Sequence, residues 1–509
     1  MFTLSGLWNN WVEMIALVMI ISGAQGVLDK EHVPLGLLYI ASILRRNGHN
    51  VKIYHLLPAE MDASIEEISR EKPLWVGLSV FSGMSAYYSS AFSKKIKELI
   101  PETTVVWGGH HPSLTAEQCL KEDFVDIVCI GEGEIASLEL TEKLELKKSL
   151  EDVKGIAYKK NGKTILNSSR ELIENLDDLP LDWSLLNMDY YKKIQGKKSK
   201  TISFYSSRGC PYNCAFCSTP QYSGRTFRYH SVEYILNNFI YLKKQGIDSV
   251  YFSDDLFLGN RQRAFKILEE LYKMGVRCET LDIRFNQIDE EALKHFNEYE
   301  TTGIFLGWES GNDRILKLMR KGITTEYVLK KAKLFEKFPE ISVWASGIIL
   351  VPTETREETM NTLFFSMKLR DIFPKSTVSI FRFMPLPKTD LTFLAAENGF
   401  EIPQKPEDWR VIDPLTSYYK VTWLNWFTKQ DDWDFRMAQE LSRNSMLDMI
   451  KGKKFGKTVK NFFVKRMRKR VNSLNFKFPI DMKVFKILLE LYNYLRFGKK
   501  RFLVTQIVK

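Results

Sequence analysis

The sequence has no hydrophobic run that could cross a membrane. The apolar run at residues 15–21 is seven residues long, whereas a membrane-spanning helix needs roughly 20. No basic segment of the kind found in secretory signals precedes this run, so we expect a cytoplasmic protein. Internal repeats and low-complexity segments are also missing. Hydrophobic residues make up 44% and charged residues 27% of the 509 residues, which is ordinary for a globular chain of about three domains.

Cysteine is scarce, with six residues in the whole chain. Three of them, Cys210, Cys214 and Cys217, lie within eight residues of one another. This clustering excludes a disulfide framework spread over a secreted domain. In a large chain it is typical of a metal-binding or catalytic site in a reducing compartment.

Excess positive charge is confined to one end of the sequence. The formal net charge is +11, but residues 451–509 contain 18 Lys and Arg against two acidic residues. Within this tail, residues 455–474 place apolar side chains along one helical stripe and basic ones on the other face. This pattern is typical of a helix that contacts a membrane surface, which would suit a lipid substrate, or of a solvated face on a docked helix. We expect no nucleic-acid partner.

Residues 15–145 alternate short apolar runs with amphipathic stretches, which predicts a Rossmann-like, doubly wound parallel sheet. Ligands of such sheets bind at the carboxyl ends of the strands. The residues at these ends are small or polar: Ser79, Ser82, Gly108, Gly109, His111, Gly131, Glu132 and Gly133. We assign residues 1–149 to this domain and 150–198 to a connector with a hairpin at Asn161-Gly162.

Six further strand–helix units predict a partial (β/α)6 barrel over residues 199–400. Helices are expected at residues 231–245, 261–274, 289–299, 312–335, 356–371 and 390–398. Residues 401–509 are expected to be mainly helical. The cysteine cluster directly follows the first barrel strand, at the carboxyl-end face where barrels hold their active sites.

Three thiolates suit either zinc or an iron–sulfur cluster. A structural zinc site needs a fourth ligand, but His230 lies 13 residues beyond Cys217 and has no partner at the usual spacing. A [4Fe–4S] cluster held by three cysteines instead leaves one iron open to a small chelating molecule.

The C-x-x-x-C-x-x-C spacing after a first barrel strand, with Phe216 before the third cysteine, resembles the radical S-adenosylmethionine (SAM) superfamily. The resemblance implies that Cys210, Cys214 and Cys217 hold a [4Fe–4S] cluster whose open iron binds SAM. The reduced cluster would then cleave SAM to a 5′-deoxyadenosyl radical. An electron donor such as flavodoxin or ferredoxin is implied as a partner.

Other strand ends agree with this resemblance. Asp254 and Asp255 would suit the ammonium group of SAM, although a helix cap or a solvated loop explains them too. Glu309 and Ser310 lie where the family contacts the ribose or carboxylate of SAM, with a capping pair as the alternative.

The run after the fifth barrel strand resembles the family's G-x-I-x-G-x-x-E adenine-binding segment. Gly347, Ile349 and Glu354 match it, but Val351 stands where a glycine is usual. A later run resembles the family's P-x-P-G-T segment, with Lys388 in place of glycine.

Residues 34–54, 105–113 and 125–134 resemble the domain that binds cobalamin in the cobalamin-dependent radical SAM class. The strand-end residues of the first domain would therefore contact cobalamin. Asp29 and His32 do not match the D-x-H-x-x-G spacing of domains that supply a histidine to cobalt. We thus expect cobalamin without a histidine ligand, or a domain that has lost cobalamin.

The resemblance implies an enzyme that C-methylates an unactivated carbon of an unknown substrate. Oxidative cyclisation or another radical rearrangement with the same cofactors is the main alternative. Methylthio transfer and a non-catalytic iron–sulfur protein are further alternatives. Aromatic residues between 400 and 450 either contact the substrate or form a packed cap.

Overall fold

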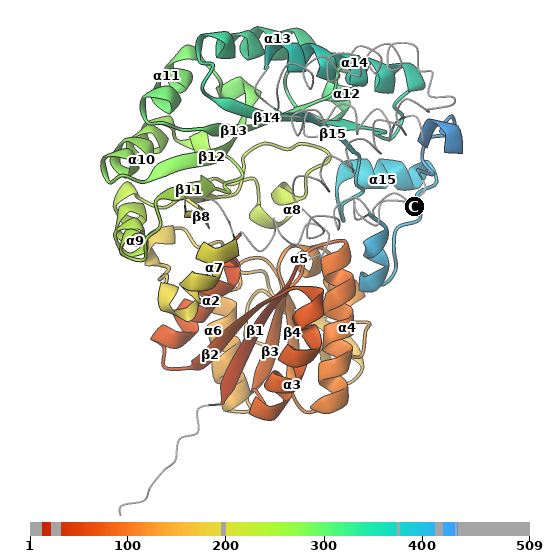
Figure 1. Cartoon of the computed structure of the whole chain (residues 1–509). Helices are drawn as coiled ribbons and strands as arrows, with labels where there is room; N and C mark the ends of the chain where they lie inside the picture. The colour runs from red at the N-terminus through yellow and green to blue at the C-terminus, as the bar shows by residue number, and fades with distance from the viewer. Residues whose placement is uncertain are drawn as a thin grey trace, which may run out of the picture.

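The computed structural model describes residues 13–21, 32–194, 200–373, 377–412, 421–432 and 435. Two α/β units lie one above the other, with the carboxyl ends of the lower unit's strands facing the upper unit (Figure 1). The predicted basic helix at residues 451–509 lies outside the described residues, as does Asp29. In the described part of the chain, no helix has both the length and the apolar character that a membrane crossing requires.

The first unit is a seven-stranded sheet in the order β2-β1-β3-β4-β5-β6-β7, and the pairings among β1 to β5 are parallel. Its strands are β1 (Met14–Ile20), β2 (Asn50–Leu56), β3 (Trp75–Ser79), β4 (Thr104–Gly108), β5 (Ile127–Cys129), β6 (Ile156–Lys160) and β7 (Lys163–Leu166). Its helices are α2 (Leu35–Arg46), α3 (Met61–Glu71), α4 (Met84–Leu99), α5 (His110–Cys119) and α6 (Glu134–Glu145).

Alternate side chains of each strand enter different cores. Ile15 and Leu17 pack with residues of α2 and α6, whereas Ala16 and Val18 pack with residues of α3 and α4. Because both faces are covered, the strands carry nearly continuous apolar runs, as predicted. The doubly wound fold is confirmed.

The hairpin predicted at residues 155–165 forms, but it is part of the first sheet rather than of a separate connector. It forms as β6 and β7, but it pairs antiparallel with β5 and so forms the edge of the first sheet. Asn161 has φ +51° and Gly162 φ +73°, the turn conformation that an Asn-Gly pair favours. Which sheet a hairpin joins depends on contacts distant in sequence, which turn chemistry does not report.

The second unit is a six-stranded parallel sheet in the order β15-β14-β13-β12-β11-β8, and it curves into a partial barrel (Figure 1). Its strands are β8 (Thr201–Phe204), β11 (Ser249–Phe252), β12 (Arg277–Arg284), β13 (Gly303–Glu309), β14 (Ser342–Ile349) and β15 (Thr377–Arg382). Its helices include α9 (Val232–Lys244), α10 (Arg261–Lys273), α11 (Glu290–Glu298), α14 (Arg356–Ile372) and α15 (Asp390–Glu397). The predicted partial barrel is confirmed.

The prediction of one continuous helix over residues 312–335 is wrong. The structure has α12 (Asp313–Leu318) and α13 (Thr325–Ala332) instead. Arg320 and Gly322 between them have left-handed φ values of +54° and +73°. The Thr324 side chain then accepts a hydrogen bond from the backbone N–H of Tyr327 and caps a new helix.

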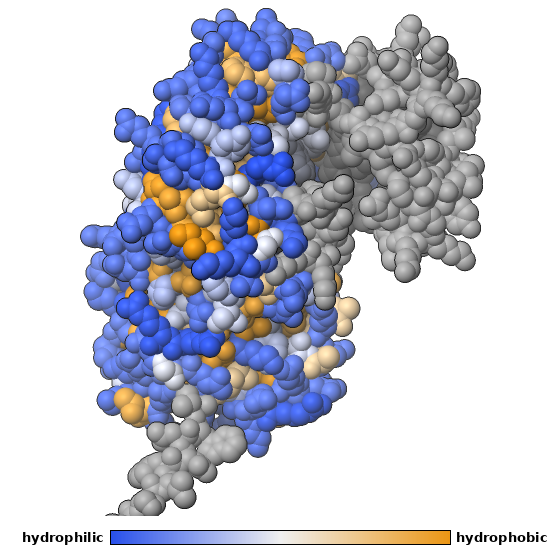
Figure 2. Space-filling view, turned by 60° about the vertical axis from the view of Figure 1, so that its left-hand side comes forward, coloured by the Kyte–Doolittle hydropathy of each residue, from blue (hydrophilic) through white to orange (hydrophobic). Residues whose placement is uncertain are grey.

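The two units share one hydrophobic core. Leu35, Leu38 and Tyr39 of α2 pack into the same buried cluster as Phe204 of β8. On another side, the short helix η7 (Pro406–Ile412) returns to α4, and the Trp409 indole N–H donates to Gln118 Oε1 over 2.9 Å. Figure 2 shows that hydrophobic residues interrupt a largely hydrophilic described surface near the middle of the molecule.

Candidate active site

The cysteine loop lies between two short elements that follow β8. It begins after β9 (Ser207–Arg208) and ends at α8 (Thr219–Ser223). Gly209 has φ +81°, and a Cβ there would lie 2.5 Å from the carbonyl oxygen of Thr226. Glycine is therefore required to bring the chain into the loop.

The three thiols lie in one electrostatic environment. Burial raises the pKa of the Cys210 and Cys217 thiols, and the charge of Asp255 acts in the same direction on both. Arg284 donates a hydrogen bond to Cys214 Sγ over 3.2 Å, and its guanidinium lies 3.8 Å from the ring centre of Tyr212. This contact places a positive charge beside one of the three sulfur atoms.

Among the described residues, no three His, Cys, Asp or Glu side chains converge as they do around a single metal ion. That arrangement gives no support to a mononuclear zinc site. An iron–sulfur cluster binds each thiolate through a different iron, so its ligands need not meet at one point.

Asp254 and Asp255 brace the cysteine loop. Asp254 accepts hydrogen bonds from the backbone N–H of Ser206 over 3.1 Å, from its hydroxyl over 2.9 Å, and from the Ser207 hydroxyl. Burial nevertheless raises the pKa of Asp254 to about 6. Asp255 accepts from the Gly209 N–H and the Thr219 hydroxyl, each over 3.2 Å. Asp254 thus holds the chain before the cysteines, and Asp255 holds it on both sides of them.

Two other buried carboxylates keep an oxygen without a hydrogen-bond partner. Asp282 Oδ1 lies on β12, and Glu354 Oε1 lies beyond β14. Burial raises the pKa of Asp282 to about 7 and that of Glu354 to about 8. Sequence reasoning did not single out Asp282, although an acidic residue between the apolar Leu281 and Ile283 is a signal that could have found it.

Several predicted contacts to SAM are engaged within the protein. Glu309 forms an ion pair of 2.6 Å with Lys321, and both side chains are more than nine-tenths buried. Ser310 pairs with Thr362 over 3.2 Å and accepts from the Asn312 N–H, which matches the capping alternative.

The other motif residues pack against the barrel core. A Cβ at Gly347 would lie 2.4 Å from the ring of Trp308, so this glycine makes room for a buried indole. Ile349 is fully buried, and Phe216 is partly buried against the same core.

Non-glycine residues with left-handed backbone gather at the carboxyl ends of the barrel strands. They are Glu309, Leu350, Thr353 and Lys388, with φ values between +57° and +68°. Lys388 thus adopts a backbone conformation that a glycine would take without strain. Near Val351, the strained residues are Leu350 and Thr353 rather than Val351 itself. Such strain often marks functional sites.

The carboxyl ends of β3 and β4 carry small or neutral residues. The Ser82 hydroxyl lies 3.0 Å from His111 Nδ1, and His111 Nε2 is buried without a hydrogen-bond partner. Burial lowers the pKa of His111 to about 3. Gly109 has φ +92° and presses against Val80, where an added Cβ would also lie 3.3 Å from Ser79 Oγ.

The remaining glycines at these ends differ in their surroundings. A Cβ at Gly131 would meet no atom within 4 Å, and one at Gly108 would make an ordinary contact of 3.6 Å with Cys129. One at Gly133 would lie 3.1 Å from Ile40 of α2. Gly131 therefore borders open space at the edge of the sheet, whereas Gly108 is in contact with Cys129 but has room for a methyl group.

Acidic residues at the end of β5 bind arginines of the barrel. Glu132 Oε1 lies 2.9 Å from both Arg208 and Arg228, and Glu134 lies 2.6 Å from Arg208. Burial tends to raise the pKa of Glu132, but hydrogen bonding by Arg228 and the charge of Arg208 lower it overall. Sequence reasoning placed Glu132 near cobalamin and missed both arginines.

A second contact joins the two units beside the cysteine loop. The His110 ring of α5 stacks on Tyr222 of α8 with centroids 4.5 Å apart. His32, which does not match the spacing expected of a cobalt ligand, packs edge-on against Tyr251 of β11 with ring centroids 5.2 Å apart.

Comparison with known proteins assigns both units. A family model for the Radical SAM superfamily matches residues 204–366, and one for the B12 binding domain matches residues 22–141. An uncharacterized methyltransferase of Pyrococcus horikoshii is 34% identical over 401 residues, which cover 77% of this chain and 85% of the relative. The chain belongs to the cobalamin-dependent radical SAM enzymes.

Two further comparisons place this radical SAM enzyme among its relatives. A candidate methylthiotransferase of Methanocaldococcus jannaschii is 30% identical over 385 residues, covering 72% of this chain and 78% of the relative. The structure of the radical SAM methyltransferase TsrM from Kitasatospora setae, with cobalamin and a [4Fe–4S] cluster bound, has a TM-score of 0.63. At 16% identity, with 78% of this chain and 81% of TsrM covered, that likeness shows a shared fold.

The enzyme uses a [4Fe–4S] cluster, SAM and cobalamin. The residues present fit these groups. The thiols beside Arg284 suit the cluster, and the unpartnered oxygens of Asp282 and Glu354 suit hydrogen-bond donors of a cationic molecule. At the first sheet, the open space at Gly131 and the unpartnered Nε2 of His111 suit a large polar ring system with side-chain amides.

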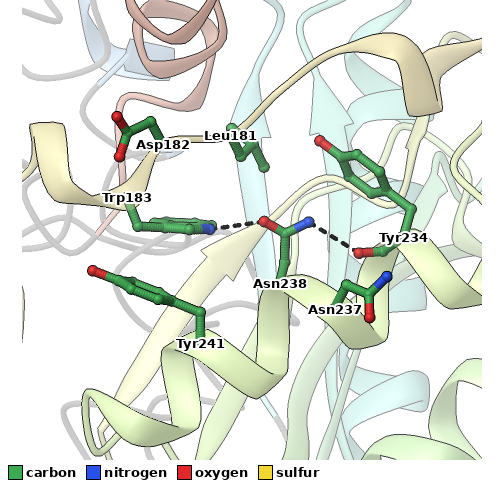
Figure 3. Close-up of a pocket in the computed structure, with 7 residues that line it drawn as sticks. All are labelled: Leu181, Asp182, Trp183, Tyr234, Asn237, Asn238 and Tyr241. Carbon is green, nitrogen blue, oxygen red and sulfur yellow. Dashed lines mark hydrogen bonds between the residues drawn. The ribbon is translucent and has the colours of Figure 1, made fainter. Parts of the chain in front are cut away.

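A pocket of about 340 Å³ lies elsewhere, where the connector crosses α9. Figure 3 shows Trp183 and Tyr241 at one side of it, and Asn238 joined by hydrogen bonds to the Trp183 indole and the Tyr234 carbonyl. No residue predicted to bind a cofactor lines it. The pocket is therefore separate from the candidate active site.

Proposed function

We propose that this enzyme transfers the methyl group of SAM to an unactivated carbon of a small-molecule or lipid substrate. When bound, the cluster and SAM supply hydrogen abstraction, and cobalamin supplies the carrier for the methyl group. In the net change one C–H hydrogen is replaced by methyl, with two SAM molecules and two electrons consumed. One SAM would give methionine and 5′-deoxyadenosine, which carries the hydrogen away, and the other would donate its methyl group and leave as S-adenosylhomocysteine. A one-electron reductant such as flavodoxin or ferredoxin supplies the electrons.

One observation carries the proposal: the segments that flank the cysteine loop contact the first residues of α5 and α6, directly after the loops that follow β4 and β5. Tyr222 beyond Cys217 stacks on His110, and Arg208 before Cys210 binds Glu134. A substrate held between these loops would be within reach of both cofactors. The methyltransferase names of the Pyrococcus relative and of TsrM also support methyl transfer.

We assign roles to the chain's own residues accordingly. Cys210, Cys214 and Cys217 hold the cluster, with the Arg284 guanidinium beside the Cys214 sulfur. Asp282 and Glu354 receive hydrogen bonds from SAM, whereas Asp254 and Asp255 keep the cysteine loop in place. The residues proposed to face cobalamin are Ser79, Ser82, Gly108, Gly109, His111 and Gly131.

Methyl-deuterated SAM tests the proposal. The reconstituted, reduced enzyme is incubated anaerobically with this SAM and a metabolite extract, and the products are analysed by mass spectrometry. We expect 5′-deoxyadenosine together with a labelled small molecule. Formation of 5′-deoxyadenosine without any methyl label in a product would contradict methyl transfer and favour cyclisation or another rearrangement.

Methylthio transfer is a second candidate because of the name of the Methanocaldococcus relative. It would call for cysteines for a second cluster. Cys119, Cys129 and Cys278 are buried in three different hydrophobic cores, which argues against a common site. Iron analysis decides: methyl transfer predicts about four irons per chain, and about eight would favour methylthio transfer.

The proposal includes a cytoplasmic enzyme, since all six cysteines are free thiols. The proposal includes membrane contact through residues 451–509 only if the substrate is a lipid. Liposome cosedimentation of the full chain and of a chain lacking these residues tests this contact, and equal binding would contradict it.

A further inference from the structure

The two units meet through a buried charge cluster that the family assignment does not explain. We call Glu132 and Glu134 of the first unit, with Arg208 and Arg228 of the barrel, the interdomain clasp. Exposed fractions of the four side chains lie between 5% and 19%. Arg228 binds both carboxylate oxygens of Glu132 over 2.9 Å and also donates to the Ile173 carbonyl over 2.6 Å.

The clasp has a rigid base on the barrel side. Arg208 and Arg228 are directly opposite each other in the antiparallel pair of β9 with β10 (Arg228–Tyr229). The Arg208 guanidinium also lies 4.9 Å from the ring centre of Tyr39 in α2. Two forked cations held side by side therefore meet two carboxylates, a geometry that fixes orientation as well as distance.

Holding the units together does not require these charges. The shared core around α2 and the return of η7 onto α4 already join them through apolar packing. Buried ion pairs contribute little net stability compared with apolar side chains of similar size, but they select one geometry among several. The clasp is therefore best explained by a need for precise orientation.

The position of the clasp indicates what it orients. Arg208 precedes Cys210 by two residues, and Glu132 directly follows Gly131 at the open strand end. We propose that the interdomain clasp is a positioning device that sets the geometry of the cluster relative to cobalamin. The stack of His110 on Tyr222 restrains the other end of the same loop. This inference rests on the two-cofactor function proposed above.

The test measures geometry in the holoenzyme, independently of turnover. A reduced cluster and cob(II)alamin each carry an unpaired electron, so the cluster speeds the spin relaxation of cob(II)alamin in a way that depends steeply on their separation. Pulsed electron paramagnetic resonance compares the full-length wild type with Arg208→Met and Glu134→Gln. Arg261→Met is the matched control, because Arg261 pairs with Asp289 and Glu291 within the barrel.

We expect both clasp variants to lose the relaxation enhancement of the wild type while Arg261→Met keeps it. Arg208→Lys, which retains the charge but lacks the fork, should lie between them. If Arg208→Met fails to assemble its cluster, Glu134→Gln decides, since it leaves the cysteine loop unchanged. Wild-type relaxation in Glu134→Gln would overturn the proposal.

Hydrogen exchange of the cofactor-free full chain gives a second measurement. Backbone amides of residues 131–134, 207–210 and 228–229 should exchange at least about tenfold faster in the clasp variants, because an unpaired buried charge favours local opening. Unchanged exchange in both variants would also contradict the proposal. A wild-type enzyme that shows the relaxation effect but transfers no methyl group would contradict the proposed function and leave the clasp supported.

Discussion

The carboxyl ends of the two sheets carry opposite chemistry. At the barrel, buried acids have a raised pKa: about 6 for Asp254, about 7 for Asp282 and about 8 for Glu354. At the first sheet, burial keeps His110 and His111 neutral by lowering their pKa to about 4 and about 3. The acids that do occur there are bound by arginines of the barrel.

This difference matches the cofactors that each end is proposed to hold. SAM carries positive charge, so carboxyl groups without a full set of partners suit the barrel end. A corrin ring with neutral amide side chains suits an end that is uncharged and has little side-chain bulk. The same parallel-strand architecture thus presents two binding faces to one interface. In the interdomain clasp, arginines of the barrel neutralise the two acidic residues of the first unit.

The largest expected effect separates the cluster cysteines from the others. Cys214→Ser should abolish iron binding and 5′-deoxyadenosine formation, because the remaining two thiolates cannot hold the cluster. Cys278→Ser, in the core of the same barrel, should keep about four irons per chain. Iron analysis and liquid chromatography measure both. Retention of iron by Cys214→Ser would contradict the assignment of the cluster.

A pair of glycines sharpens the comparison between the two ends. Gly347→Ala in the barrel should destabilise the fold by about 1–3 kcal/mol, because the new methyl group meets Trp308. Gly36→Ala in α2 meets no atom within 4 Å and should stabilise it by about 0.5–1 kcal/mol. Urea unfolding monitors both. Equal stabilities would show that Gly347 serves the cofactor alone.

The acidic barrel end predicts a pH dependence of stability. Burial raises the pKa of Glu354 from 4.5 to about 8, so the folded protein keeps a proton that the unfolded chain has lost. Stability contributed by this proton is present below about pH 4.5 and falls as the pH rises towards 8, by up to about 1 kcal/mol per pH unit.

Glu354→Gln should remove this part of the slope in cofactor-free protein unfolded by urea between pH 5 and 8. Glu326→Gln, at an exposed position of α13, should leave the slope as in the wild type. The same slope in all three proteins would indicate that Glu354 is ionised in the folded state.

The smallest expected effect concerns backbone strain at the barrel end. Lys388 has φ +57°, which costs a residue with a side chain roughly 1–2 kcal/mol. Lys388→Gly should therefore stabilise the protein by about 0.5–1 kcal/mol after the entropy of the unfolded chain is included. Lys405→Gly, at an exposed loop position without a left-handed φ, should not stabilise. A loss of stability in Lys388→Gly would show that other contacts compensate the strain.

Local patterns predicted most of the fold. Apolar runs of four to eight residues located the barrel strands, because burial on both faces leaves a signal within each strand. The cysteine spacing predicts the cluster loop because it, too, is a signal contained in one short segment. The break between α12 and α13 was missed because the sequence around it favours a helix and a single glycine, Gly322, was not taken as a helix end.

Partners of the site residues could not be predicted in the same way. Arg208 and Arg228 bind Glu132 across 76 and 96 residues of sequence, and no local periodicity reports such a contact. Asp254, Ser310 and Gly347 matched family motifs, yet their contacts hold the loop, a helix end and a buried indole. A motif locates a residue at the site without telling which neighbour it serves.

Iron and cobalamin counted together on one chain test the central claim most directly. After reconstitution of the full-length protein, we expect about four irons and one cobalamin in the wild type. Gly108→Ala, whose added methyl group has room in the fold, should lose cobalamin and keep its iron, whereas Cys214→Ser should lose iron and keep cobalamin. A wild type without cobalamin, or variants that lose both groups together, would contradict two separate faces for two cofactors.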